Sequence, residues 1–226
     1  MDIILIGGLW LHRPAWDSVV PLLEKAGHHP TAVLLPGQGD DSANATLGDQ
    51  LTAVTHAIDS CAGPVMVVGH SAACTLAWMA ADARAQKTAQ VVMIGGFPSA
   101  DGETYADFFA YEDGVMPFPG WEQFDGPDSR DLDQELRDRM TAGFVPVPEA
   151  VAKGVVHLRD KRRYDVPVAV VCPEFSVNDA QQWVADGIPE LQNAKHVSYV
   201  DIDSGHWPMF SRPAELARLL SKIANG

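Results

Sequence analysis

The sequence predicts an α/β protein, with a mostly parallel six-stranded sheet covered by helices on both faces. Short apolar runs alternate with longer amphipathic segments along most of the 226 residues, the pattern of parallel strands joined by crossover helices. The composition, 46% hydrophobic and 20% charged, is ordinary for a compact domain. A chain of this length can bury a core without disulfides or metals. We therefore expect residues 1–226 to form a single domain.

The predicted strands are short, apolar runs, and most of them are followed by a segment with helical spacing. Six strands make a sheet of normal size. The strands are expected at residues 3–6, 31–35, 64–69, 91–95, 167–172 and 197–202. The helices are expected at residues 16–26, 48–60, 72–85, 178–186 and 213–223.

Residues 98–164, called here the cap segment, interrupt this alternation. The segment has no convincing buried strand, but it contains seven aromatic residues between Tyr105 and Phe124 and the turn-forming sequences FPGW and DGPD. It also contains an acidic helical stretch, DLDQELRDRM, which is typical of a solvated helix face. We interpret the cap segment as a helical insertion that lies over the sheet.

Charge and cysteine content exclude several classes of partner. Sixteen Lys and Arg against thirty Asp and Glu give a net charge of −14, which repels nucleic acid and anionic membranes. The expected partner is a small-molecule substrate. Cys61, Cys74 and Cys172 have no CxxC spacing, so they predict neither a disulfide framework nor a zinc site. Together with a start that lacks a basic leader and a long apolar run, they favour the cytoplasm.

The sequence Gly-His-Ser-Ala-Ala at residues 69–73 directly follows the strand VMVV and opens a helical stretch. A nucleophile elbow needs this context, with small residues around a strained turn that exposes a serine hydroxyl. Ser71 is that serine, and the N–H of Ala72 at the helix start is a natural donor to an oxyanion. The alternative is a serine that caps the helix in an ordinary turn.

A nucleophilic serine needs a base, and His206 is the best placed of the eight histidines, in a loop between the last strand and the last helix. His70 precedes the serine and is expected to be a packing residue that borders the site. The sequence has no GxGxxG after a strand, no P-loop and no HExxH. It therefore predicts no nucleotide cofactor and no metal.

The order of these features resembles the α/β-hydrolase superfamily: a strand, a Gly-Gly loop, a PGQGDDS turn, the GHSAA sequence, inserted helices and a late SGHWP histidine. The segments LLEKAGHHPTAVLLPGQG and SGHWPMFSRPAELARLL are similar to the small esterase branch that includes plant methylesterases and hydroxynitrile lyases. The resemblance implies a three-layer hydrolase fold without its usual N-terminal hairpin. It also implies a triad in the order serine, acid, histidine, with acyl transfer through an acyl-enzyme.

The chain departs from the family pattern at the oxyanion loop and at the acid. The usual His-Gly is Gly7-Gly8 here, so the N–H of Leu9 is the expected second oxyanion donor, with that of Trp10 as the fallback. An ungapped match puts Ser176 at the acid position. Glu174, nearest the end of the strand, is the expected acid that orients the histidine. Asp179 is one alternative, although it could instead cap the helix that follows. The other alternative is that this loop supplies no acid.

Three functions follow from this resemblance. The first is hydrolysis of a small or medium, largely apolar carboxylic ester or lactone. The second is C–C bond hydrolysis or a lyase reaction, although the hydroxynitrile lyases carry a lysine where this chain has Trp207 and a threonine at Gly8. The third is non-catalytic binding of a small molecule. The expected pocket residues are Gly8, Trp10, His70, Phe108, Phe109, Phe118, Trp121 and Trp207.

Overall fold

The fold is built on one six-stranded parallel sheet. The computed structural model describes residues 1–40, 42 and 44–226, so that Asp41 of the PGQGDDS turn lies outside the described residues. The strand order is β2-β1-β3-β4-β7-β8, and every neighbouring pair is parallel. The predicted fold class is therefore confirmed. The strands are β1 (Asp2–Ile6), β2 (His29–Ala32), β3 (Val65–His70), β4 (Thr88–Ile94), β7 (Val168–Cys172) and β8 (Val197–Asp201).

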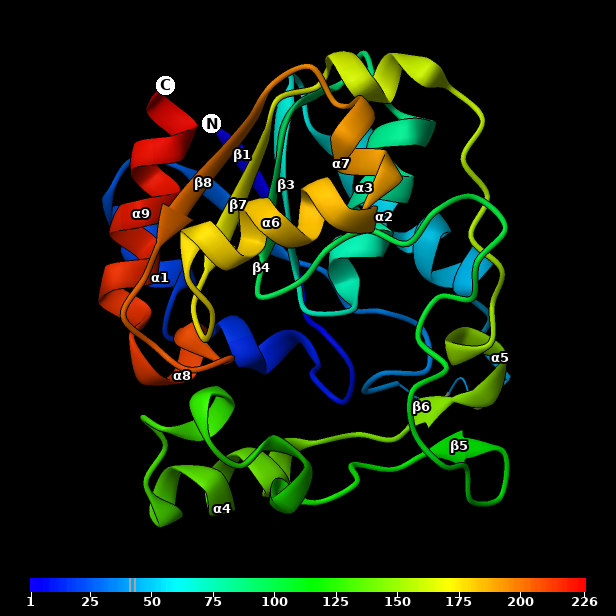
Figure 1. Cartoon of the computed structure of the whole chain (residues 1–226), viewed down its shortest axis with the longest axis vertical. Coiled ribbons are helices and arrows are strands. Elements are labelled where there is room, and N and C mark those ends of the chain that lie inside the picture. The colour runs from blue at the N-terminus through cyan, green and yellow to red at the C-terminus, as the bar shows by residue number, and fades with distance from the viewer. Residues whose placement is uncertain (41, 43) are drawn as a thin grey trace.

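Helices cover both faces of the sheet (Figure 1). Side chains of β1 alternate between the two faces, with Ile4 and Ile6 in one core cluster and Ile3 and Leu5 in the other, as the two-residue period of a strand requires. The face of Ile4 is covered by α2 (Leu47–Ser60), α3 (Ala73–Ala83), α6 (Val177–Gly187) and α7 (Pro189–Asn193). The opposite face is covered by α1 (Val20–Lys25), α8 (Pro208–Ser211) and α9 (Pro213–Asn225).

The strand predicted at residues 31–35 is displaced towards the N-terminus. β2 pairs with β1 only over His29–Ala32, and the chain leaves the sheet after the N–H of Val33 donates to a carbonyl of β1. Val33 and Leu35 are nevertheless buried, with 8% and 3% exposure. The apolar run therefore reflects burial in the core beyond the end of the strand.

The helix predicted at residues 16–26 is shorter than expected, because α1 covers only Val20–Lys25. A 3-10 turn, η1 (Arg13–Trp16), precedes α1, and each element has a proline in its first turn. Proline is favoured there because its ring fixes a helical φ and the missing N–H has no intrahelical partner in any case. Pro14 and Pro21, seven residues apart, thus each lie at the start of a short element, η1 and α1.

Residues 113–152 of the cap segment lie beyond the carboxyl ends of the strands (green in Figure 1), and the end of the segment runs back to the amino ends of the strands, where Arg163 pairs with Asp82 of α3. The acidic stretch forms α4 (Gln134–Gly143), as expected, and a shorter helix, α5 (Glu149–Ala152), follows. Contrary to the expectation of a purely helical insertion, β5 (Val115–Met116) and β6 (Val147–Pro148) form a small antiparallel sheet. Strands of two residues are too short to give a sequence period. The 3-10 turns η2 (Trp121–Phe124), η3 (Pro127–Ser129) and η4 (Lys161–Asp165) complete the segment and its end.

Helix α3 runs through the interior of the molecule. Every residue from Ala73 to Asp82 is buried, which is typical of a helix packed on all sides. Its N-terminus follows β3, the central strand between β1 and β4, after only two residues. The turn between β3 and α3 is therefore fixed by the best-packed part of the fold.

Candidate active site

The turn between β3 and α3 holds Ser71 in a strained conformation. Its φ of 55° lies in the left-handed region, which costs a residue other than glycine about 1–3 kcal/mol. The N–H of Ser71 donates to the carbonyl of Ile94 in β4 over 2.8 Å, and its own carbonyl accepts from the N–H of Cys74 in α3 over 2.9 Å. These two hydrogen bonds hold Ser71 in the turn between β3 and α3, as the sequence predicts.

Three glycines around Ser71 leave no room for a side chain. A Cβ on Gly69 would lie 2.3 Å from a carbonyl oxygen of α3, and one on Gly96 would lie 2.6 Å from the carbonyl oxygen of Ser71. A Cβ on Gly8 would lie 3.0 Å from the Cβ of Ser71. None of these glycines has a positive φ. Space, and not backbone conformation, therefore requires glycine at these positions.

His206 lies in the loop between β8 and α8, where the cap segment holds it. The N–H of His206 donates to the carbonyl of Asp128 over 2.7 Å. Gly205 permits this approach, because a Cβ there would lie 2.2 Å from the same oxygen. Arg130 adds a second attachment by donating to the carboxylate of Asp203 over 2.9 Å. The position of the histidine thus depends on the cap segment as well as on the sheet.

The side chain of Glu174, two residues after β7, reaches the imidazole of His206. The Nδ1–H of His206 donates to Oε1 of Glu174 over 2.6 Å, and the two side chains are 13% and 12% exposed. Burial lowers the pKa of His206, but the charge and hydrogen bond of Glu174, with the charge of Asp128, raise that pKa above its ordinary value. Because Nδ1 carries the donated proton, Nε2 is the nitrogen that can exchange a proton with another group.

Asp179, the alternative acid, is engaged elsewhere. Its carboxylate accepts from the N–H and the hydroxyl of Ser176, and its own N–H donates to the Ser176 hydroxyl. This is the capping box at the N-terminus of α6. Ser176, which an ungapped match puts at the acid position, is thus the first residue of a helix cap, and Glu174 is the carboxylate that reaches His206.

His70 packs against His206 with 4.9 Å between ring centroids. It is 1% exposed, and its Nε2–H donates to the carbonyl of His206 over 2.8 Å, an acceptor that assigns the proton to this nitrogen. Burial and the neighbouring His206 lower the pKa of His70 well below its ordinary value. His70 is therefore a neutral ring that supports the backbone of His206 and also borders the cavity described below.

The residues after β1 form a tight turn, called here the Gly8–Leu11 turn. The N–H of Leu11 donates to the carbonyl of Gly8 over 3.2 Å, and Trp10 has a φ of 62°. No backbone hydrogen bond to another described residue uses the N–H of Leu9 or the N–H of Ala72. These are the two N–H groups that the sequence analysis predicts as oxyanion donors.

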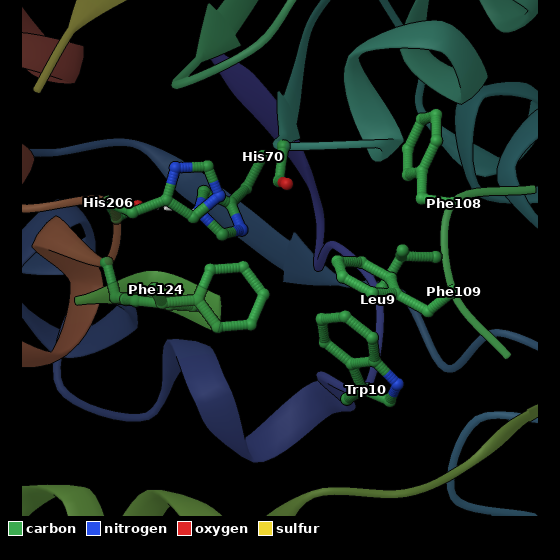
Figure 2. A pocket seen from close by; sticks show the side chains of 9 residues that line it. Leu9, Trp10, His70, Phe108, Phe109, Phe124 and His206 are labelled. Carbon is green, nitrogen blue, oxygen red and sulfur yellow. Dashed lines mark hydrogen bonds between the residues drawn. The ribbon is translucent and has the colours of Figure 1, made fainter. Parts of the chain in front are cut away.

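A cavity of about 180 Å³ opens beside these groups. Figure 2 shows aromatic side chains arranged around an open space, with His70 and His206 at one side. Phe108, at 64% exposure, is the wall residue most open to solvent. The cavity is lined by Leu9, Trp10, His70, Ser71, Phe108, Phe109, Phe124, His206 and Trp207.

Apart from Leu9, Ser71 and His206, which were predicted for catalytic roles, the lining differs from the predicted pocket at four positions. Gly8, Phe118 and Trp121 do not line the cavity, whereas Phe124, which was not predicted, does. Gly8 lies beneath Ser71, as described above. Phe118 stacks on Phe124 at 5.7 Å, and Trp121 packs edge-on against the cavity wall at 5.3 Å, so both form a layer behind the lining. Phe124 follows Trp121 by three residues in a 3-10 turn, a spacing that places both on one side.

Neither a metal site nor a membrane-spanning helix is found in residues 1–40, 42 and 44–226. Within these residues no cluster of three or more His, Cys, Asp or Glu side chains is arranged to hold a metal ion. Within the same residues no helix is long and apolar enough to cross a membrane.

Comparison with known proteins gives one family and several structures. The model of the Alpha/beta hydrolase family matches residues 3–219. A search of curated protein sequences found no match. Because the structural matches below are at most 20% identical in sequence, they bear on the fold alone.

Three solved structures superpose on nearly the whole chain. A pyrethroid hydrolase from Sphingobium faniae is 20% identical, with a TM-score of 0.76 over 100% of this chain and 98% of that one. An extracellular alpha/beta-hydrolase from a Paenibacillus species, described as homologous to tobacco salicylic acid binding protein 2, is 17% identical, with a TM-score of 0.80 over 98% of each chain. A methylesterase from Arabidopsis is 16% identical, with a TM-score of 0.78 over 100% and 99%.

Proposed function

Because the chain belongs to the alpha/beta hydrolase family, we propose that it is a serine hydrolase that cleaves a small, largely apolar carboxylic ester or lactone. The observation that carries this proposal is the placement of three groups. Ser71 and His206 border one cavity. The Nδ1–H of His206 donates to Glu174, which leaves the other ring nitrogen, Nε2, for proton exchange. A strained serine, a histidine and an orienting carboxylate are the parts that nucleophilic acyl transfer requires.

The proposed reaction has two steps. Oγ of Ser71 attacks the carbonyl carbon while Nε2 of His206 takes the hydroxyl proton, and the imidazolium then gives that proton to the departing alkoxide. Water next attacks the acyl-enzyme as His206 takes one of its protons, and the imidazolium then returns that proton to Oγ of Ser71 as the carboxylic acid leaves, which regenerates the free serine. Glu174 stabilises the imidazolium through its 2.6 Å hydrogen bond. The N–H groups of Leu9 and Ala72 are the proposed donors to the oxyanion.

The walls of the cavity support the proposed substrate class. Six of its nine lining residues are apolar or aromatic, and the space of about 180 Å³ admits a small group on the reacting carbonyl. The net charge of −14 disfavours a strongly anionic substrate. Two structural neighbours are described as a pyrethroid hydrolase and a methylesterase, names that denote hydrolysis and ester cleavage.

The proposed compartment is the cytoplasm. Cys61, Cys74 and Cys172 are all free, and the latter two are buried. Unpaired cysteines suit a reducing compartment. Since the Paenibacillus neighbour is described as extracellular, fractionation of the source cells with a tagged chain is the direct test.

The first test is covalent labelling with a fluorophosphonate, read by intact mass and peptide mapping. We expect one adduct, on Ser71, because activation by His206 makes this hydroxyl far more nucleophilic than the others. Ser71→Ala should abolish the adduct, and Ser18→Ala, which changes an exposed serine, should leave it unchanged. A folded chain that takes no label would overturn the proposed function.

The second test distinguishes the three functions with substrates. A hydrolase should cleave short aryl esters and lactones and lose nearly all of this activity in Ser71→Ala and His206→Ala. Turnover of β-diketones or cyanohydrins without ester cleavage would identify a C–C bond hydrolase or lyase. Tight binding of a ligand without turnover, indifferent to Ser71→Ala, would identify a binding protein.

A further inference from the structure

One buried side chain binds both ends of the Gly8–Leu11 turn. The amide nitrogen Nε2 of Gln38 donates to the carbonyl of Gly8 and to the carbonyl of Leu11, each over 3.0 Å. Gln38 is 1% exposed. Both N–H bonds of one amide are thus used on the two carbonyls that flank Leu9 and Trp10.

A second buried amide fixes the first. Nε2 of Gln50, in α2, donates to Oε1 of Gln38 over 2.9 Å and to the carbonyl of Pro36 over 3.0 Å. Gln50 is fully buried. The chain of hydrogen bonds therefore runs from a helix in the core, through Gln38, to the turn beside Ser71, and it leaves the Gln38 amide with one orientation.

The glycines of the PGQGD sequence bring Gln38 into this place. Gly37 and Gly39 have φ values of 77° and 99°, in the region where L side chains are strained. A Cβ on Gly37 would also lie 2.5 Å from the ring of Pro148, and one on Gly39 would lie 2.9 Å from Nδ1 of His12. The motif is thus more than a flexible turn, because its glycines let the backbone point the intervening glutamine at the Gly8–Leu11 turn.

Resting on the proposed function, we propose that Gln38 is a positioning residue that sets the oxyanion hole by fixing the N–H of Leu9. The turn needs such support, because the φ of 62° at Trp10 is strained and persists only when its surroundings enforce it. An oxyanion donor acts only when it lies about 2.7–3.1 Å from the developing charge. A misplacement of about 1 Å is enough to lower a rate by about 10²-fold.

The cap segment holds the same turn from the other side. The indole N–H of Trp10 donates to the carbonyl of Met116 over 3.1 Å, and the carbonyl of Trp10 accepts from the N–H of Val145 over 2.9 Å. These contacts fix Trp10 but do not involve the carbonyls of Gly8 and Leu11, which accept from Gln38 and, for Gly8, also from the N–H of Leu11. Loss of the Gln38 amide should therefore loosen the turn without releasing the indole that lines the cavity.

The test compares Gln38→Leu and Gln38→Glu with matched changes at the exposed Gln86, Gln86→Leu and Gln86→Glu. Leucine removes the donors, and glutamate keeps the shape but presents an acceptor to two carbonyls. We expect kcat for an aryl ester to fall about 10²-fold in both Gln38 variants, with KM within about threefold of the wild-type value because the cavity walls stay in place. The Gln86 variants should match the wild type.

Two further readouts separate positioning from a general loss of structure. Inhibition by a trifluoromethyl ketone, whose adduct with Ser71 carries an oxyanion, should weaken by the same factor as kcat/KM. In Gln38→Leu, which adds no charge, the pH midpoint of kcat/KM should not move, because Glu174 and His206 are untouched. Gln50→Leu, which removes the support of the Gln38 amide, should give a smaller loss of the same kind.

The outcomes are distinct. Wild-type kcat in folded Gln38 variants, alongside a wild-type chain that labels and turns over, would overturn this inference and leave the proposed function standing. A wild-type chain that takes no fluorophosphonate would overturn both. If Gln38→Leu, Gln38→Glu and Gln50→Leu lose activity only in proportion to folded protein, measured by circular dichroism, the role is structural and the inference also fails.

Discussion

The Nδ1–H of His206 donates to Oε1 of Glu174 over 2.6 Å, although the two residues lie 32 positions apart, one after β7 and the other after β8. β7 and β8 are neighbouring parallel strands, so their carboxyl ends meet at the same edge of the sheet. The contact therefore follows from the topology. The other oxygen of this carboxylate, Oε2, is buried and has no hydrogen-bond partner among the described residues, which leaves the acid committed to His206.

Glu174→Gln should lower kcat/KM by about 10³–10⁴-fold, because an amide neither stabilises the imidazolium nor selects the correct tautomer. Asp179→Asn is the matched control, since this carboxylate belongs to the capping box of α6. It should leave kcat/KM unchanged and lower the unfolding midpoint by about 2–4 °C, as expected for the loss of about 1 kcal/mol from a cap. A loss of less than about threefold in Glu174→Gln would contradict the assignment of the acid.

The pH dependence of kcat/KM should report the raised pKa of His206. His206 acts as a base only when deprotonated, so the rate should rise with pH and reach half its plateau above the ordinary histidine value of about 6.5. In Glu174→Gln the charge that stabilises the proton is lost, and the midpoint of the residual activity should move to lower pH. A midpoint that moves upward, or a rate that falls with rising pH, would contradict the assignment of His206 as the base.

Gly69→Ala should destabilise the fold and the site together, because its Cβ would lie 2.3 Å from a backbone oxygen that cannot move without shifting α3. We expect a loss of about 1–3 kcal/mol or more in urea denaturation, with slower fluorophosphonate labelling of the folded fraction. Gly63→Ala is the control, since a Cβ there meets nothing within 4 Å and the φ is not positive. Equal stability of the two variants would show that the contact around Ser71 can relax.

Arg163→Met should cost about 3–5 kcal/mol of folding free energy. Arg163 is 5% exposed and pairs with Asp82 at 3.1 Å and Glu190 at 2.8 Å, both of which are also buried. The substitution leaves two buried carboxylates without their cation. Arg162→Met, which breaks an exposed pair with Asp160, should cost less than about 1 kcal/mol. Similar urea midpoints for the two variants would contradict this assignment.

The sequence was most informative where long-range packing and local pattern agree. The strand before Ser71 and the helix after it are both apolar runs of sufficient length, so their boundaries fell within two residues of β3 and α3. For the acid that orients His206, the sequence favoured Glu174 in the loop after β7, but it left open Asp179 and the possibility that this loop supplies no acid. The choice between the two carboxylates depends on which of them points towards His206. Asp179 does not, because the capping box with Ser176 holds its carboxylate at the N-terminus of α6.

Other features left no trace that a single sequence displays. Gln38 acts on backbone carbonyls, which every residue has, so no partner residue type reveals it. The cavity lining also escaped a full prediction, because only some of the aromatics of the cap segment reach the cavity and others pack behind them. Only the folded chain decides that Phe124 lies in front of Phe118.

The glycines beneath Ser71 divide the site into a part that natural variation can alter and a part that it cannot. Selection for a new ester substrate cannot change the three glycines around Ser71, because a side chain at Gly8, Gly69 or Gly96 would meet backbone atoms or Ser71 itself. Phe108 and Phe109, by contrast, lie in a loop of the cap segment and line the cavity with their side chains, and Phe108 is 64% exposed. Directed evolution of this chain should therefore find mutations that change substrate selectivity in the cap segment. Substitutions there can change the range of substrates without altering the residues around Ser71.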